Sequence, residues 1–438
     1  MQFPRLPSMS INLRDSLLKA LSAHPGTREF HVHVLVSSPR KTNTLYPFAK
    51  PKPRVHLQDI LVLLSEQSSP EVSRVFVTAI EANVYTIPST SCAVFHVSKV
   101  DSTGQAADPS PTATLVRGLL KYYADPVTRP VQAEHLWIQL FARAQSQYLF
   151  PNSSEWEGKK WLSDIKLCAW WKRLLTRVVA ELDHEGKKTK MFYLLPGYSD
   201  VEAENAMRIA SSSSSGPLTV PEMEWVYGHP YSQSDVPMPC PQEKMMNLGH
   251  YIPYFDDDPK SRFLDEIAFI TDGGAESPRR KRPRTMVEGK EKEKEEKEEK
   301  VKVKEEVKDE RPQGEMGKVT VDEFWERMSF RQECVAGAVT GFFTVVVSGV
   351  GVGVGGEARG QVSSQVNKRI MTSLLTGVEF GTKEQGVKAT DTLESAIKGL
   401  CEGDYSDIYG RVQTRNAIVT VKSSVVAVRE LSVRRRKR

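Results

Sequence analysis

Apolar and polar residues alternate over several short segments in the first 270 residues, as they do in strands that bury one face. These segments are 28–36 (REFHVHVLV), 74–80 (RVFVTAI), 92–100 (CAVFHVSKV) and 190–195 (KMFYLL). In 113–123 and 159–182, apolar residues recur every three or four positions, which predicts amphipathic helices. We therefore expect an α/β fold, a single domain with a central mixed sheet surrounded by helices.

Local signals mark where several helices begin. Ser110 and Pro111 suit the N-cap and first position of the helix that continues through 113–123. Asp258 and Pro259 have the same arrangement further along the chain. An apolar helical period resumes at 320–343, where Thr320 and Glu323 fit a capping box, and another runs over 368–400.

A charged stretch at 271–317 separates two globular parts. It contains hardly any apolar residue that a core would bury, so we expect a disordered linker that interrupts the fold. The expected divisions are then a core at 1–270, C-terminal helices at 318–402 that complete it, and a basic tail at 403–438. Within the second part, 344–366 has the composition of a Gly/Val-rich low-complexity insertion.

Composition and charge narrow the class of protein. The 438 residues are 39% hydrophobic and carry a formal charge of only +5, too mild by itself to indicate nucleic-acid binding. Five cysteines are scattered singly, which favours a reducing compartment. The N-terminal sequence has no secretory pattern, and no apolar run reaches the roughly 18 residues of a membrane span. Basic clusters at 279–284 and 434–438 are typical of nuclear import, so we expect a nuclear protein.

Three groups of residues are candidates for chemistry. The strand–loop–helix unit at 92–123 offers a helix N-terminus, where an anion such as a pyrophosphate is favoured. The adjacent carboxylates of 256–258 repel one another and suit the binding and deprotonation of a lysine ammonium. Aromatic residues that are able to wall a channel for an aliphatic lysine stem are Trp137, Trp161, Trp170, Trp171, Trp225 and Tyr227. The nine histidines form no HExxH motif, so metal catalysis is disfavoured.

Three segments together resemble a known enzyme family: 141–162 (FARAQSQYLFPNSSEWEGKKWL), 255–267 (FDDDPKSRFLDEI) and 324–343 (FWERMSFRQECVAGAVTGFF). They are similar to the fungal histone acetyltransferases named as regulators of Ty transposition, whose fold is related to the metazoan CREB-binding-protein acetyltransferases. The resemblance implies transfer of acetyl from acetyl-CoA to histone H-3, chiefly to its core lysine at position fifty-six, with some tail lysines. It also implies stimulation by histone chaperones of the nucleosome-assembly and anti-silencing types, and a role in replication-coupled nucleosome assembly and genome stability.

The resemblance also assigns roles to individual residues. The coenzyme contacts that it implies are Val100, Asp101, Ser102, Pro109, Ser110, Pro111, Thr112, Ala113, Trp170, Lys188 and Lys190. The catalytic carboxylates are Asp258 and the adjacent Asp257, and Lys260 is the lysine that acetylates itself. Trp171, Trp225 and Tyr254 are expected to line the substrate-lysine channel. The metazoan relatives have a tryptophan followed by a tyrosine where this chain has Trp170 and Trp171, so the tyrosine proposed there as general acid is absent from that position.

Two other functions remain open at this point. A non-catalytic chromatin adaptor would use the charged linker and basic tail to bind histones or chaperones. A nucleotide-dependent enzyme would use Gly351, Gly353 and Gly356, which match a dinucleotide fingerprint although no helix pattern opens at the last glycine. Saturable binding of acetyl-CoA separates the acetyltransferase from the adaptor.

Overall fold

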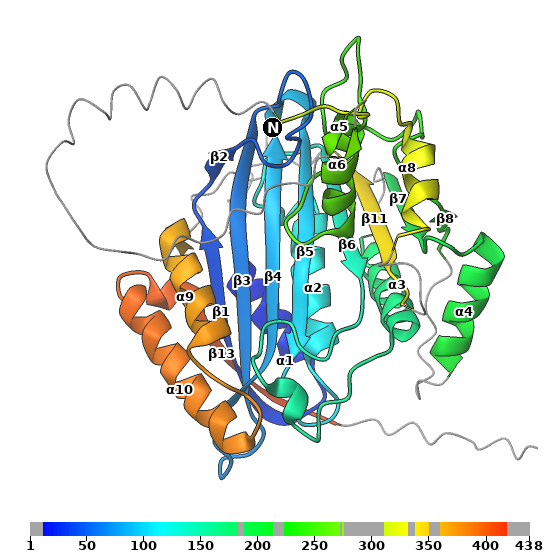
Figure 1. The fold of residues 1–438 in the computed structure, drawn as a ribbon. Coiled ribbons are helices and arrows are strands. Elements are labelled where there is room, and N and C mark those ends of the chain that lie inside the picture. The colour runs from blue at the N-terminus through cyan, green and yellow to red at the C-terminus, as the bar shows by residue number, and fades with distance from the viewer. Residues whose placement is uncertain are drawn as a thin grey trace, which may run out of the picture.

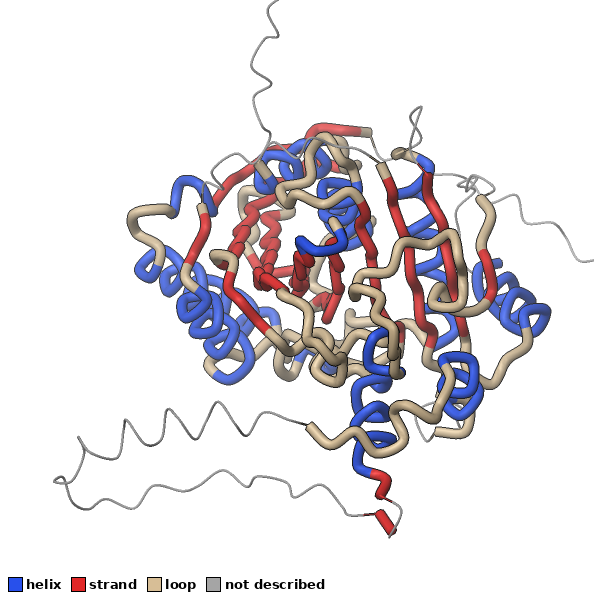
Figure 2. Tube along the Cα trace, turned by 90° about the horizontal axis from the view of Figure 1, so that it is seen from above, coloured by secondary structure: helices blue, strands red, loops and turns tan. Residues whose placement is uncertain are grey.

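A computed structural model describes residues 12–182, 188–212, 223–271, 274–275, 311–331, 338–349 and 360–417. Most of the expected linker, both basic clusters and Gly351–Gly356 lie outside these residues. The described part has the predicted fold class, because a central mixed sheet is flanked by helices on both sides (Figures 1 and 2).

Among the described residues, one mixed sheet of 11 strands has the order β12-β1-β3-β4-β5-β6-β11-β7-β8, and β13 and β2 pair with β1 and β3. The strands are β1 (Gly26–Ser37), β2 (Arg40–Thr42), β3 (Val55–Gln67), β4 (Val75–Ile87), β5 (Cys92–Ser102), β6 (His135–Ala142), β7 (Lys188–Leu194), β8 (Val226–Tyr227), β11 (Gly341–Ser348), β12 (Gln361–Val362) and β13 (Tyr409–Asn416). A separate hairpin joins β9 (Ile270–Thr271) and β10 (Gly274–Ala275). The predicted strands at 28–36, 74–80, 92–100 and 190–195 correspond to β1, β4, β5 and β7.

Helices bury apolar side chains on both faces of the sheet. One face is covered by α1 (Leu13–Ser22), α2 (Thr112–Ala124), α3 (Asp164–Ala180) and α4 (Asp200–Ser212). The opposite face carries two groups, seen at the two sides of Figure 1. The first is α5 (Leu248–Tyr251), α6 (Pro259–Phe269) and α8 (Val321–Met328), and the second is α9 (Ser364–Thr376), α10 (Lys383–Leu400) and α11 (Tyr405–Ile408).

Helix boundaries agree with the sequence signals where a side chain caps the helix. Asp258 and Thr320 are N-caps whose side chains accept hydrogen bonds from backbone N–H groups of α6 and α8. The start of α2 differs by one residue, because Pro111 is its N-cap and Ser110 precedes it. The start of α3 differs by more, since the chain before Asp164 is held in a loop rather than continuing the helix from 159.

Two expected divisions of the chain are wrong. Residues 344–348, predicted to begin a low-complexity insertion, belong to β11, which pairs antiparallel with both β6 and β7 inside the sheet. Residues 409–416, predicted to belong to a basic tail, form β13, which pairs antiparallel with β1. The helical period expected over 320–343 ends with α8 at Met328, and the chain re-enters the sheet at Gly341.

Two further properties of the described residues bear on the class of protein. None of their helices combines the length and the apolar character that crossing a bilayer requires. Cys92, Cys168, Cys240 and Cys401 are free thiols in the interior, and Cys334 lies outside the described residues.

Candidate active site

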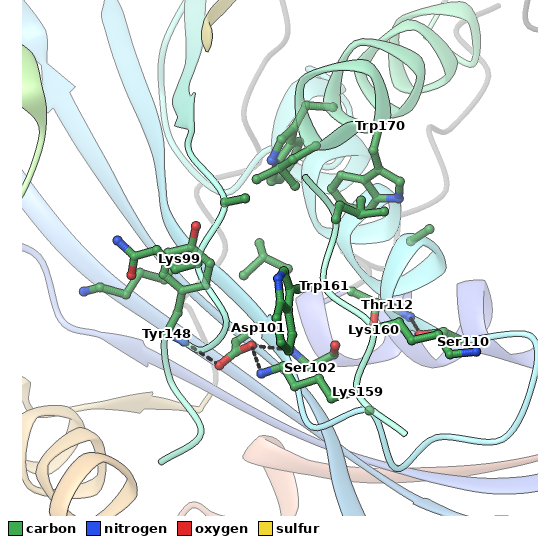
Figure 3. Close-up of a pocket in the computed structure, with 18 of the residues that line it drawn as sticks. Lys99, Asp101, Ser102, Ser110, Thr112, Tyr148, Lys159, Lys160, Trp161 and Trp170 are labelled. Atoms are coloured by element: carbon green, nitrogen blue, oxygen red, sulfur yellow. Dashed lines mark hydrogen bonds and ion pairs between the residues drawn. The ribbon is translucent and has the colours of Figure 1, made fainter. Parts of the chain in front are cut away.

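A cavity of about 660 Å³ opens where two parallel strands separate. Pairing between β5 and β6 ends at His96 and Gln139, although both strands continue beyond these residues. The cavity lies between the separated ends. Its walls include Leu167, which packs with the α1–α4 core, and Phe141, which packs with the α5, α6 and α8 core. The opening therefore reaches from one face of the sheet toward the other. Figure 3 shows its labelled lining residues, which come from β5, the start of α2, the segment before α3, and α3 itself.

The N-terminus of α2 forms one end of the cavity. Of the predicted coenzyme residues, Val100, Asp101, Ser102, Ser110, Thr112, Ala113 and Trp170 line it, as does Trp171 from the predicted channel. The N-cap residue Pro111 has no side chain that can cap α2, and in its first turn only the Thr112 N–H has a side-chain partner in the described part of the chain, Ser110 Oγ at 3.4 Å. The combination of these donors with the positive end of the helix dipole suits the phosphates of a nucleotide-containing ligand.

Asp101 holds one wall of the cavity in place. Its Oδ2 accepts hydrogen bonds from the backbone N–H groups of Tyr148, Leu149 and Phe150, at 2.8, 2.8 and 3.1 Å. Its Oδ1 lies 3.0 Å from Nζ of Lys159, and this ammonium also donates to Ser153. Burial lowers the pKa of Lys159, whereas Asp101 acts in the opposite direction. Because its oxygens are occupied in this way, Asp101 shapes the cavity and is not free to bind a ligand directly.

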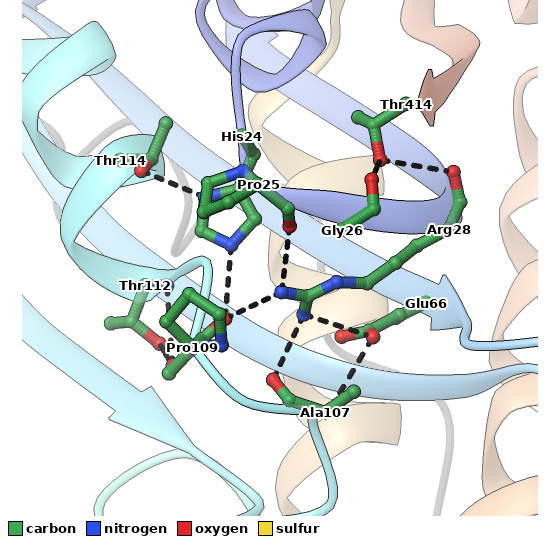
Figure 4. A network of polar contacts seen from close by, with 11 residues as sticks. His24, Pro25, Gly26, Arg28, Glu66, Ala107, Pro109, Thr112, Thr114 and Thr414 are labelled. Atoms are coloured by element: carbon green, nitrogen blue, oxygen red, sulfur yellow. Dashed lines mark hydrogen bonds and ion pairs between the residues drawn. The ribbon is translucent and has the colours of Figure 1, made fainter. Parts of the chain in front are cut away.

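A second buried ion pair fixes the loop that precedes α2. The Arg28 guanidinium lies 3.2 Å from Glu66 and donates to the carbonyl oxygens of Ala107, Pro25 and Pro109 (Figure 4). Glu66 in turn accepts a hydrogen bond from the N–H of Ala107. Pro109 is therefore part of the support behind the cavity. Neither it nor Pro111 is a lining residue.

The predicted channel residues do not meet in one place. Trp171 packs edge-to-face on Trp170, with ring centroids 4.8 Å apart, at the cavity. Trp225 packs on the same face of the sheet and donates to Thr176, whereas Tyr254 lies on the opposite face and donates to Asp265. Since only Trp171 of the three lines the cavity, Trp225 and Tyr254 do not wall a channel that opens from it.

The acidic turn at 256–258 lies beside β5, where a ring stack anchors it. The His96 imidazole and the Phe255 ring are parallel, with centroids 3.8 Å apart. Burial, with a smaller contribution from Lys260, lowers the pKa of His96 well below its ordinary value, so the ring is neutral. Asp257 has φ of 62°, a left-handed conformation that aspartate tolerates better than most residues, and its side chain is 80% exposed.

Asp258 and Lys260 form a buried pair behind that turn. Asp258 is 0% exposed and accepts a hydrogen bond from the Lys260 backbone N–H at 2.8 Å. The Lys260 ammonium lies 2.9 Å from Oδ2 of Asp258 and faces the rings of Phe255 and Phe342, at 5.5 and 5.1 Å. The Lys260 ammonium and Oδ2 of Asp258 therefore form an ion pair without the geometry of a hydrogen bond. Of the predicted catalytic pair, Asp257 is thus the carboxylate that is open to solvent.

The two remaining coenzyme candidates lie elsewhere in the sheet. Lys188 and Lys190 are on β7, opposite Ser348 and Val346 of β11, and neither lines the cavity. Lys190 instead forms an ion pair with Asp235. Among the described residues, no group of three or more His, Cys, Asp or Glu side chains has the arrangement of a metal site.

Several cavity residues were not among the sequence candidates. They are Lys99, Arg143, Tyr148, Lys159 and Lys160, together with Trp161, which the sequence suggests only as a channel residue. Burial raises the pKa of Tyr148 to about 12, so its hydroxyl keeps its proton at neutral pH. Most of these residues lie in 141–162, the segment used for the family resemblance, which was the available signal. Lys99 lies in the part of β5 that extends beyond its last residue paired with β6. No sequence pattern indicates where that pairing ends.

Comparisons with known proteins agree with the fold. A profile of the histone acetyltransferase KAT11-type domain matches residues 120–415. The histone acetyltransferase rtt109 of Aspergillus flavus is 29% identical over 328 residues, which are 68% of this chain and 49% of that protein. The protein of the same name from Schizosaccharomyces pombe is 26% identical over 324 residues, 73% of this chain and 68% of the relative.

A solved structure is also similar. The crystal structure of Rtt109 from Aspergillus fumigatus matches with a TM-score of 0.67 and 23% identity, and the match covers 93% of this chain and 100% of that one. At this identity the likeness supports the fold. The match to the Aspergillus flavus protein spans about half of that relative's length.

Proposed function

The chain belongs to the histone acetyltransferase family defined by the KAT11-type domain, and from this premise we propose that it transfers the acetyl group of acetyl-CoA to the ε-amine of a histone lysine. The observation that carries the proposal is the cavity of about 660 Å³ between β5 and β6. It extends from a helix N-terminus suited to phosphates to Lys99, whose ammonium lies 3.8 Å from Asp257 in the acidic turn. Acetyl-CoA bound from the α2 end and a lysine bound at the acidic turn would meet between the two strands.

In this proposal acetyl-CoA is the co-substrate and lies along the cavity. The first turn of α2, with Ser110 and Thr112, binds the phosphates, and Val100 and Ser102 contact the chain of the coenzyme at the end of β5. Trp170 and the exposed Trp161 cover it from the side of α3. Holding the thioester and the amine together supplies the main part of the rate enhancement, because it converts an encounter into an intramolecular step.

The acidic turn receives the substrate lysine. Asp257, which solvent reaches, attracts the ammonium and accepts its proton, and the neutral amine then attacks the thioester carbon. The acetyl group moves to nitrogen, the C–S bond breaks, and the coenzyme thiolate takes up a proton. Asp258 fixes the turn through its bond to the Lys260 N–H. General base catalysis of this kind contributes about 10² to 10⁴-fold.

Lys260 is proposed as the autoacetylated lysine. Its acetylation removes the positive charge that neutralises Asp258, so the turn as a whole becomes more negative and attracts a lysine ammonium more strongly. Lys260→Arg keeps the charge and blocks the modification. We expect this variant to have a several-fold lower rate of histone acetylation, and an unchanged rate contradicts this part of the proposal.

The substrate and partners are proposed from the family resemblance. They are histone H-3 in complex with H-4, with the core lysine at position fifty-six as the main acceptor and tail lysines as secondary ones. Histone chaperones of the nucleosome-assembly and anti-silencing types present the substrate. The setting is the nucleus, in replication-coupled nucleosome assembly and the response to DNA damage, and the basic clusters at 279–284 and 434–438 support nuclear import.

The test is transfer of labelled acetyl from acetyl-CoA to histone H-3/H-4, with and without a histone chaperone. We expect label in H-3, an increase with chaperone, and a large loss in Asp257→Asn. Asp256→Asn, next to it in the same turn, is the matched control and keeps most of the activity. The acceptor lysine is identified by mass spectrometry of the labelled H-3.

Binding of acetyl-CoA distinguishes this function from that of an adaptor. A ligand that binds only the folded state raises its stability by mass action, so the unfolding temperature should rise with acetyl-CoA concentration and saturate. A folded protein that binds H-3/H-4 but is not stabilised by acetyl-CoA, and that transfers no label, is an adaptor and contradicts the proposal.

A further inference from the structure

Lys99 occupies an unusual position in the cavity wall. It follows a β-bulge in β5. Glu81 and Ala82 are adjacent in β4, but their partners in β5, Lys99 and Val97, are two residues apart. Ser98 is therefore the extra residue, and bulges of this kind redirect the side chains that follow them. Lys99 lines the cavity beyond the last residue of β5 that pairs with β6. In Figure 3 it lies at the side away from Ser110 and Thr112.

Two carboxylates surround the Lys99 ammonium. Nζ lies 2.9 Å from Oε2 of Glu81 and 3.8 Å from Oδ2 of Asp257. The Lys99 side chain is 28% exposed, so it is neither locked in the interior nor free in solvent. It is thus a lysine of the cavity wall whose amine lies beside the carboxylate to which the proposed function assigns the substrate lysine.

The other lysines of the cavity lack this combination. Lys159 is 5% exposed and is held by both Asp101 and Ser153. Lys160 is exposed and forms no ion pair with any carboxylate in the described part of the chain. Only Lys99 combines a place in the cavity, access to solvent and neighbours that accept a proton.

We propose that Lys99 is itself an acetyl acceptor, a site of self-modification separate from Lys260. This inference rests on the proposed function, because acetyl-CoA in the cavity is the donor. Glu81 or Asp257 accepts one proton from the ammonium, and the neutral Nζ attacks the thioester carbon. The N–C bond forms as the C–S bond breaks, and the second proton that nitrogen loses neutralises the coenzyme thiolate. The products are an acetamide at Lys99 and free coenzyme A.

The modification changes the charge at the entrance for the substrate lysine. An unmodified Lys99 neutralises Asp257 and Glu81, and so competes with a histone lysine for the same carboxylate. Acetylation removes one positive charge and releases both carboxylates. The protein should therefore bind cationic substrates more tightly after it has modified itself.

The experiment follows label from acetyl-CoA into the full chain and into histone H-3/H-4 in the same sample. Mass spectrometry of the peptide that contains Lys99 gives its rate of acetylation. We expect a first-order rate that is unchanged over a tenfold range of protein concentration, because the reaction is intramolecular. Lys121 is the matched control, since it also pairs with a glutamate, Glu181 at 2.8 Å, but lies on the outer surface of α2 and lines no part of the cavity. It should be labelled at least tenfold more slowly.

Variants then test the chemistry and its effect. Glu81→Gln should slow labelling of Lys99 several-fold, with Asp257 as the remaining acceptor. Lys99→Gln should have a several-fold lower KM for histone than Lys99→Arg, with similar KM values for acetyl-CoA.

The outcomes separate this inference from the proposed function. Labelled histone with Lys99 unlabelled, or labelled no faster than Lys121, overturns the inference and leaves the proposed function standing. No label in histone or Lys99 overturns both. Labelling of Lys99 that increases with protein concentration assigns the reaction to a second molecule and overturns the intramolecular step.

Discussion

Buried ion pairs fix backbone segments at the cavity and beside it. In the described part of the chain, three ion pairs have both side chains at most 5% exposed: Arg28–Glu66, Lys159–Asp101 and Lys260–Asp258. The first two hold segments that line the cavity, the loop before α2 and the loop after β6, and the third holds the acidic turn beside it. Buried pairs contribute little net stability, because removing charges from water offsets their attraction. Their effect here is to fix backbone segments in place.

The two aspartates of the catalytic proposal should respond differently to loss of charge. Asp257→Asn leaves a polar residue on an exposed turn, so we expect loss of acetyl transfer with unchanged stability. Asp258→Asn retains an N-cap but leaves the Lys260 ammonium buried without its counter-charge, which should lower the free energy of unfolding by about 3 kcal/mol. Initial rates and urea denaturation measure the two effects. Equal destabilisation by both substitutions would contradict the different burial of the two carboxylates.

Removal of Arg28 should destabilise the protein more than removal of the whole pair. Arg28→Met leaves Glu66 buried and unpaired, with an expected loss of about 3–5 kcal/mol. Burial already raises the pKa of Glu66, an effect that Arg28 counteracts. The double variant Arg28→Met/Glu66→Leu should therefore be more stable than Arg28→Met alone. Urea denaturation measures the free energies of unfolding of the single and double variants. The control is Lys121→Met, which breaks an ion pair on the surface and should cost less than about 1 kcal/mol.

At the scale of elements, the loop after β5 depends on a glycine. Gly104 has φ of +77°, and a Cβ there would lie 2.5 Å from Cα of Lys159. Gly104→Ala should therefore push apart the two loops that form the cavity wall, lower the free energy of unfolding by about 1–3 kcal/mol and raise the KM for acetyl-CoA.

A glycine in α10 is the matched control. Gly399 has no atom within 4 Å of the position of an added Cβ, so Gly399→Ala should stabilise the helix by about 0.5–1 kcal/mol. Thermal unfolding and steady-state kinetics of both variants provide the test. A Gly104→Ala enzyme with unchanged KM for acetyl-CoA would show that the two loops do not shape the binding site.

Elements with strong local patterns were predictable from the sequence, and those defined by their partners were not. β1 and β5 alternate apolar and polar residues, and Asp258 with Pro259 marks the start of α6. β11 is buried on both faces, so its run of apolar residues lacks the alternation that predicts a strand. β13 is an edge strand with few apolar residues, and only its pairing with β1 makes it a strand.

The candidate site was predictable to a similar extent. The first turn of α2 and the acidic turn have local signals, and their predicted residues lie at or beside the cavity. The contribution of Lys99 depends on where β5 and β6 separate and on a bulge, which are properties of the sheet. Lys188 is a coenzyme contact that the family resemblance implies, but its strand, β7, is separated from β6 by β11.

At the scale of the whole molecule, acid should weaken the fold through buried histidines. Burial lowers the pKa of His33 on β1 to about 3. Between the usual histidine pKa near 6.5 and about 3, the unfolded chain binds a proton that the folded one does not, so stability is full above pH 6.5 and falls as pH decreases below it. The expected slope is about 1.4 kcal/mol per pH unit for this residue.

Replacement of His33 tests this dependence. His33→Gln retains a polar partner for the Tyr405 hydroxyl, 3.2 Å from the His33 ring nitrogen, and removes the titration. Urea denaturation at several pH values between 7 and 5 gives the free energy of unfolding at each pH. Its slope against pH should correspond to about one proton fewer in the variant than in the wild type. A slope that remains the same in the variant would mean that other groups account for the acid sensitivity.

The position of β11 between β6 and β7 also means that the sheet is completed late during synthesis. Its neighbours β6 and β7 leave the ribosome long before it, and neither pairs with the other. Until residue 348 has been translated, the growing chain therefore carries two strand edges with unpaired N–H and C=O groups, the feature that promotes pairing with other chains. We therefore expect a nascent chain of this protein to be prone to aggregation until β11 enters the gap and makes the sheet continuous.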